Sequence, residues 1–177
     1  MSTDEREYNL AVLKQHLANG ANWFYWIAGL SLINLVIAIA GGKIHFIVGS
    51  SFVEVCSGVA EAAGPILKTL AFIFSFLILG FYLFLGRYAN RAAKWAFILG
   101  MVIYGIDGLV YLLVEDFLPA AFHGYVLYKL YTGMAVIPEY LALQQDLIDN
   151  PPMQEAAMET LPNEEPAVAI EAAPTQE

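Results

Sequence analysis

The sequence predicts an all-α integral membrane protein: a four-helix bundle with an N-terminal amphipathic helix, an outer-surface amphipathic helix and a disordered acidic C-terminal tail. Of its 177 residues, 59% are hydrophobic and only 14% are charged, and the mean hydropathy is +0.59. Soluble domains are about 45–50% apolar and about 25% charged. Four apolar stretches of about twenty residues each match the roughly 30 Å thickness of a hydrocarbon core.

The net charge of −9 comes from the C-terminal end of the chain. Residues 138–177 hold nine of the 17 acidic residues and no Lys or Arg, so the other eight acids balance the eight bases. The remainder is neutral and offers no basic surface for nucleic acid. We expect the acidic tail to be cytoplasmic and, beyond a short helix that ends at Asn150-Pro151-Pro152, disordered, because it is rich in Pro, Ala and Glu.

Residues 1–20 predict a separate amphipathic helix at the membrane surface. Ser2 and Glu5 have capping-box spacing, Asn19-Gly20 is a stop signal, and one helical stripe carries three leucines, Leu10, Leu13 and Leu17. The segment lacks the apolar centre and cleavage site of a signal peptide. The first span is therefore expected to direct insertion.

The four predicted spans are residues 22–41, 65–86, 95–114 and 118–137. Between the second and third lies a short basic loop containing Arg87, Arg91 and Lys94. Short basic loops remain in the cytoplasm. This places both termini in the cytoplasm, with the protein in a plasma (inner) membrane.

Residues 45–62 divide into an apolar face and a face with Ser50, Glu54 and Glu61. The pattern predicts an interfacial helix on the outer surface. A fifth span or a re-entrant segment is the alternative.

Two ionisable residues in the predicted spans lie symmetrically about Glu115. Asp107 precedes it by eight residues and His123 follows it by eight, so an antiparallel hairpin brings both to about the same depth. Polar groups in lipid usually face the bundle interior and take partners, which predicts a hydrogen bond between them. Asn34 and Ser75 fall at a similar depth in the first two spans, completing a polar layer.

Helical spacing also predicts which face of each hairpin helix points inward. On the third span it is the stripe Gly100, Tyr104, Asp107, Gly108, Tyr111 and Glu115; on the fourth it is Gly124, Tyr128 and Tyr131.

The polar layer has three interpretations. Asp107 and His123 either fix the hairpin register, form a proton or ligand site, or contribute to a metal site with His45, Glu54 or Glu115 on the outer face. No HxxxH or ExxH spacing supports the metal site, and the single Cys56 excludes an internal disulfide.

Lys129, the other charged residue of the fourth span, either extends to the inner interface or pairs with Asp107. Tyr82 is expected at an interface.

No motif identifies a reaction or a cofactor. The leading hypothesis is a non-enzymatic accessory or interaction subunit of a membrane assembly, with a membrane protein, a second copy of the chain or a basic protein as partner. One alternative is a proton or small-solute transport component that uses Asp107, His123 and Asn34. Another is a membrane enzyme at the outer interface that uses His45, Glu54, Asp107 and His123.

Overall fold

The computed structural model describes residues 2–40, 65–113 and 115–151, and these residues form helices without any strand. The helices are α1 (Thr3–Ile39), α3 (Pro65–Ala89), α4 (Lys94–Leu113), α5 (Phe117–Ala135) and α6 (Ile137–Asp149). Three of them, α1, α3 and α4, are long and apolar enough to cross a membrane. The helical class is confirmed. The predicted interfacial helix 45–62, with His45 and Glu54, and the tail after residue 151 lie outside the described residues.

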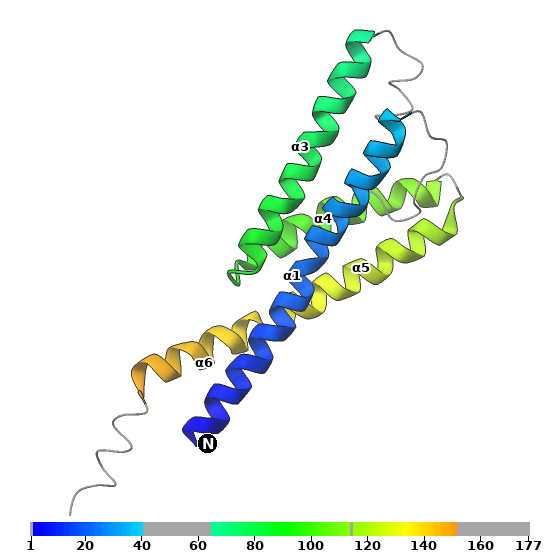
Figure 1. The fold of residues 1–177 in the computed structure, drawn as a ribbon. Coiled ribbons are helices and arrows are strands. Elements are labelled where there is room, and N and C mark those ends of the chain that lie inside the picture. The colour runs from blue at the N-terminus through cyan, green and yellow to red at the C-terminus, as the bar shows by residue number, and fades with distance from the viewer. Residues whose placement is uncertain (1, 41–64, 114, 152–177) are drawn as a thin grey trace, which may run out of the picture.

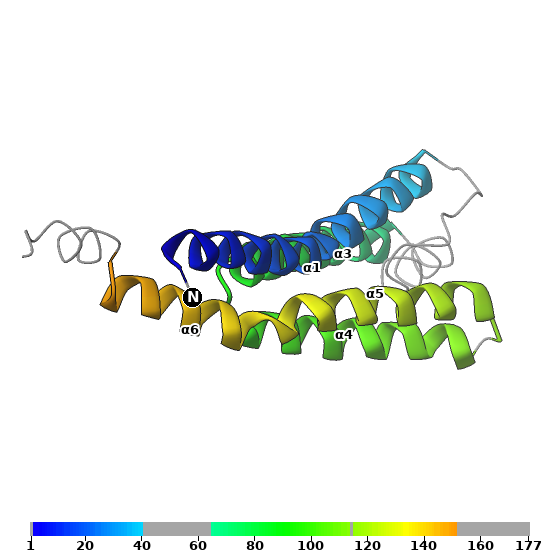
Figure 2. The same cartoon turned by 90° about the horizontal axis from the view of Figure 1, so that it is seen from below.

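The helices pack in two layers, and α1 contacts helices of both. Figure 2 shows α1 and α3 in one layer and α4 and α5 in the other, and α1 contacts α3, α5 and α6. In Figure 1 the two pairs diverge away from the point where α1 crosses α5. The main core comes from all four long helices and includes Phe24, Leu85, Phe97 and Leu130. The longest helix, α1, therefore links the two layers.

The predicted boundary at Asn19-Gly20 is wrong, because α1 continues through it for 37 residues in total. The predicted start is confirmed: the Glu5 backbone N–H donates to Ser2 Oγ at 3.3 Å, and the Ser2 N–H donates to Glu5 Oε2 at 3.0 Å. At 1.5 Å per residue, α1 is about 55 Å long, well beyond a hydrocarbon core. The N-terminal segment is thus a continuation of the same helix rather than a separate one.

A contact with α5 explains why Gly20 does not end the helix. A Cβ placed on Gly20 would lie 2.5 Å from Gly133 Cα, and a Cβ on Gly133 would lie 2.6 Å from Gly20 Cα. Such small-residue contacts let two helix backbones touch. The packing offsets the roughly 0.5–1 kcal/mol that glycine costs inside a helix.

The N-terminal segment of α1 packs against α6, as Figure 2 shows, instead of lying alone on a surface. Arg6 Nη1 donates to Asp146 Oδ2 at 3.1 Å. α6 ends at Asp149, just before the Asn150-Pro151 stop that the sequence predicted.

The fourth predicted span corresponds to α5, which is not among the helices apolar enough to cross a membrane by composition. Pro119, His123 and Lys129 reduce its hydropathy. Its place in the membrane stays a prediction.

Candidate functional site

Asp107 and His123 form a buried pair between α4 and α5. Asp107 is 0% exposed and His123 is 2% exposed. Their closest atoms, His123 Nε2 and Asp107 Oδ2, lie 3.1 Å apart. The hydrogen bond expected from their equal spacing about Glu115 is therefore present.

The second ring nitrogen determines how protons are arranged in this pair. His123 Nδ1 lies 2.9 Å from the Pro119 carbonyl oxygen, which can only accept, so Nδ1 carries a hydrogen and donates it. A hydrogen must then also lie between Nε2 and Oδ2. The pair is either imidazolium with carboxylate or neutral imidazole with carboxylic acid. Both forms have zero net charge, which lowers the cost of burial in a low dielectric.

Three residues of α4 surround the imidazole. The Tyr104 ring stacks on it with centroids 4.2 Å apart at 17°, and the Tyr111 ring lies at 5.2 Å and 45°. A Cβ at Gly108 would lie 2.8 Å from His123 Cβ, so glycine is what permits this close approach. The side chain of His123 is held by ring contacts as well as by two hydrogen bonds.

The inward face of α4 is largely as predicted, since Gly100, Tyr104, Asp107, Gly108 and Tyr111 are all buried. Glu115 is not part of it. It is exposed in the turn after α4, with a φ of 59°.

The predicted inward face of α5 is wrong. Gly124, Tyr128 and Tyr131 are exposed. The buried residues follow helical spacing through the histidine instead: Pro119, His123, Val126, Leu130 and Gly133. Taking His123 as the anchor of the face would have identified this set.

All four residues of the predicted polar layer, Asp107, His123, Asn34 and Ser75, are buried. Ser75 donates to the Ala71 carbonyl at 2.9 Å, within its own helix. Asn34 is 2% exposed, and Ser31, one turn away on α1 and missed in the sequence, is 0% exposed.

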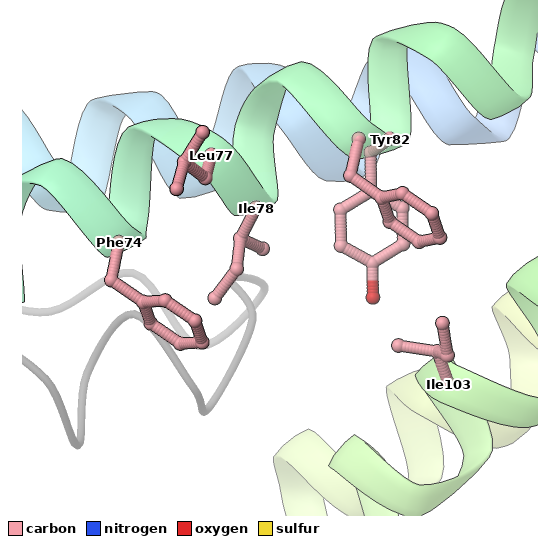
Figure 3. Close-up of a pocket in the computed structure, with 6 residues that line it drawn as sticks. Phe74, Leu77, Ile78, Tyr82 and Ile103 are labelled. Atoms are coloured by element: carbon pink, nitrogen blue, oxygen red, sulfur yellow. The ribbon is translucent and has the colours of Figure 1, made fainter.

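Two tyrosine hydroxyls near the pair are buried without a hydrogen-bond partner among the described residues, those of Tyr82 and Tyr104. Their rings meet edge to face, 6.3 Å apart at 87°. The interfacial position expected for Tyr82 is wrong, because it is 0% exposed. Its side chain projects from α3 toward α4 beside an apolar cavity of about 440 Å³ (Figure 3), which is lined by Phe74, Leu77, Ile78, Phe81, Tyr82 and Ile103.

Lys129 does not belong to the buried pair. Its Nζ lies 5.5 Å from the centroid of the Tyr125 ring, and Asp107 bonds to His123 instead. The predicted ion pair between Lys129 and Asp107 is not present among the described residues.

Among the described residues, no group of three or more His, Cys, Asp or Glu could hold a metal ion. Of the three residues suggested to recruit a metal, His45 and Glu54 are not described, and Glu115 is exposed in its turn. Comparison with protein families, curated proteins and solved structures found no match.

Proposed function

We propose that the chain is a small multi-pass membrane protein that acts as a non-enzymatic accessory or interaction subunit of a membrane assembly. In this proposal α1, α3, α4 and α5 cross a plasma (inner) membrane as a four-helix bundle. Three basic residues keep the turn between α3 and α4, and both termini, in the cytoplasm: Arg87 in the last turn of α3, Arg91 in the turn itself and Lys94 at the start of α4. The residues 45–62 would then follow the first span on the outer side.

The burial of the Asp107–His123 pair is the observation that carries this proposal. A general acid or base has to reach its substrate within hydrogen-bond distance or through one water. Asp107 has no exposed surface, and its partner lies against two tyrosine rings. Such a pair is better suited to fixing the register of two helices, since interhelical hydrogen bonds in membranes contribute about 0.6–2 kcal/mol.

The exposed apolar side chains of α3 support an interaction role. Large apolar side chains follow this helix and are half or more exposed: Ile66, Leu67, Leu70, Ile73, Phe74, Phe76 and Leu77. In a membrane, lipid or another apolar helix covers such a surface.

Purification of the tagged full chain from native membranes in a gentle detergent, followed by native mass spectrometry, tests the proposal. We expect a stoichiometric membrane-protein partner or a second copy of the chain. A monomer with no partner across several mild detergents would contradict it.

A proton-binding component of a transporter is the second candidate, favoured by a specific observation. The hydrogen-bond geometry requires the pair to hold a proton. The Tyr104 ring stacks on His123 and meets the ring of Tyr82, which lines the apolar cavity.

Asp107→Asn separates the two candidates. The asparagine amide can donate to Nε2 of a neutral imidazole, so the interhelical bond survives, but no proton can be exchanged. An accessory subunit keeps its partner and its stability in this variant. A proton carrier loses proton flux in proteoliposomes while it stays folded.

A further inference from the structure

A polar hollow of about 440 Å³ lies between α1 and α5, away from the Asp107–His123 pair. From α1 it is lined by His16, Asn19, Asn22 and two tryptophans, and from α5 by Tyr125, Lys129 and Thr132. The apolar cavity of Figure 3, in contrast, lies between α3 and α4.

The hollow arises where the two helices cross. The contact between Gly20 and Gly133 brings the backbones together, so the longer side chains on either side stand as walls. Trp23 packs edge to face against Tyr125 with centroids 5.4 Å apart at 87°, and this contact joins the two walls.

The lining favours an anion. It contains one permanent charge, Lys129, and no carboxylate. The ammonium lies over the Tyr125 ring at 5.5 Å, a cation–π contact that leaves its N–H donors available. His16 and the side-chain amides of Asn19 and Asn22 can add further donors. Thr132 does not, because its hydroxyl donates to the Lys129 carbonyl at 2.9 Å.

We propose that this hollow binds the phosphate group of an anionic glycerophospholipid in the cytoplasmic leaflet. The inference rests on the membrane placement proposed above, which puts the start of the first span, residues 22–41, on the cytoplasmic side. Trp23 and Trp26 lie at this end of the span. Tryptophan rings settle at the headgroup level of a bilayer, which puts Lys129 beside the lipid phosphates. The aromatic wall, with Trp26 62% exposed and Tyr125 47% exposed, gives the glycerol and the upper acyl chain an apolar surface that a free phosphate ion would not use.

Fluorescence quenching by brominated lipids tests the site, because two of the three tryptophans line it. The third, Trp95, packs on Tyr88 and Phe84 elsewhere and is replaced by Phe in every protein used. The full chain is reconstituted in phosphatidylcholine vesicles that contain a small fraction of either phosphatidylglycerol or phosphatidylcholine with brominated chains.

We expect brominated phosphatidylglycerol to associate with the tryptophans about fivefold more strongly than brominated phosphatidylcholine, the factor that corresponds to about 1 kcal/mol for one basic residue near the surface. Lys129→Gln removes the preference. Lys94→Gln, which loses the same charge on the proposed cytoplasmic face but outside the hollow, keeps it. Asn22→Ala, an exposed position, gives an intermediate preference and serves if Lys129→Gln fails to fold.

Equal quenching by the two lipids in the protein that carries only the Trp95 replacement would overturn the site. A preference that survives both Lys129→Gln and Asn22→Ala would overturn it as well. If millimolar glycerol 3-phosphate abolished the preference, the hollow would bind soluble phosphate esters and the lipid assignment would be wrong. If neither brominated lipid quenched the tryptophans, the membrane placement itself would be wrong, and with it the proposed function.

Discussion

Replacing Gly20 by alanine tests how closely α1 and α5 cross. The added carbon would lie 2.5 Å from Gly133 Cα, 3.0 Å from Gly133 N and 3.1 Å from the Lys129 carbonyl oxygen. Ordinary carbon contacts are about 3.5–4.0 Å, so the helices have to separate by roughly 1 Å, because backbone atoms cannot rotate away. Overpacking costs about 1–3 kcal/mol, and the better helix propensity of alanine returns about 0.5–1 kcal/mol. The difference spans about 0–2.5 kcal/mol, and because the contact is with backbone atoms that cannot rotate away, we expect a net loss in the upper part of it, about 1–2 kcal/mol.

The free energy of unfolding is measured by titrating SDS into the protein in a mild detergent and following the helical circular dichroism signal. Gly29→Ala in the same helix and Gly124→Ala in α5 are matched controls, since a Cβ at either position meets nothing within 4 Å. Both controls should be neutral or stabilising. If Gly20→Ala leaves the unfolding free energy unchanged, or if the controls lose as much, the close crossing of the two helices is refuted.

Three further predictions concern topology, the N-terminal segment and the buried tyrosine. With Cys56 replaced by serine, a cysteine at Asn90 should react with an impermeant maleimide only after the cytoplasmic side is opened, and one at Asp116 should react from outside; external labelling of Asn90 would reverse the orientation. Arg6→Gln should destabilise the protein by at most about 1 kcal/mol, because its acidic partner on α6 is half exposed, and should speed amide exchange in α6 but not in α4; unchanged exchange in α6 would show that the ion pair does not hold it. Tyr104→Phe should leave stability unchanged or raise it in the same SDS titration, since no partner for the hydroxyl is present among the described residues; a loss above about 1 kcal/mol would show that the hydroxyl is bonded.

Features that depend on local sequence could be predicted. Hydropathy located α3 and α4 to within a few residues because a span needs a continuous apolar stretch. The Asp107–His123 bond followed from equal spacing about Glu115, since a short turn fixes the relative depth of two consecutive helices. The number of residues on each side of Glu115 was therefore enough to predict that Asp107 and His123 meet.

Features that depend on distant contacts could not be predicted. Asn19-Gly20 reads as a helix end, and only the approach of Gly133 from α5 reveals why the helix continues. The hollow around Lys129 has the same origin, because its walls come from two helices far apart in the chain.

The error on α5 had a different cause. The tyrosines Tyr128 and Tyr131 were assigned to the interior together with Gly124, although tyrosine is amphipathic and is common on surfaces that meet the membrane interface. The inward face is instead the one that carries His123, because a polar side chain within a span faces the bundle interior, where it finds a partner.

A double-mutant cycle on Asp107 and His123 tests the central claim most directly, namely that this pair locks α4 to α5. Removing one partner leaves the other buried without its bond, so Asp107→Ala and His123→Ala should each lower the free energy of unfolding by about 1–3 kcal/mol. The double variant should then lose little more than the larger single loss, because the same interaction is removed. Two strictly additive losses in the SDS titration would contradict the account, since they would mean that the two side chains do not interact in the folded protein.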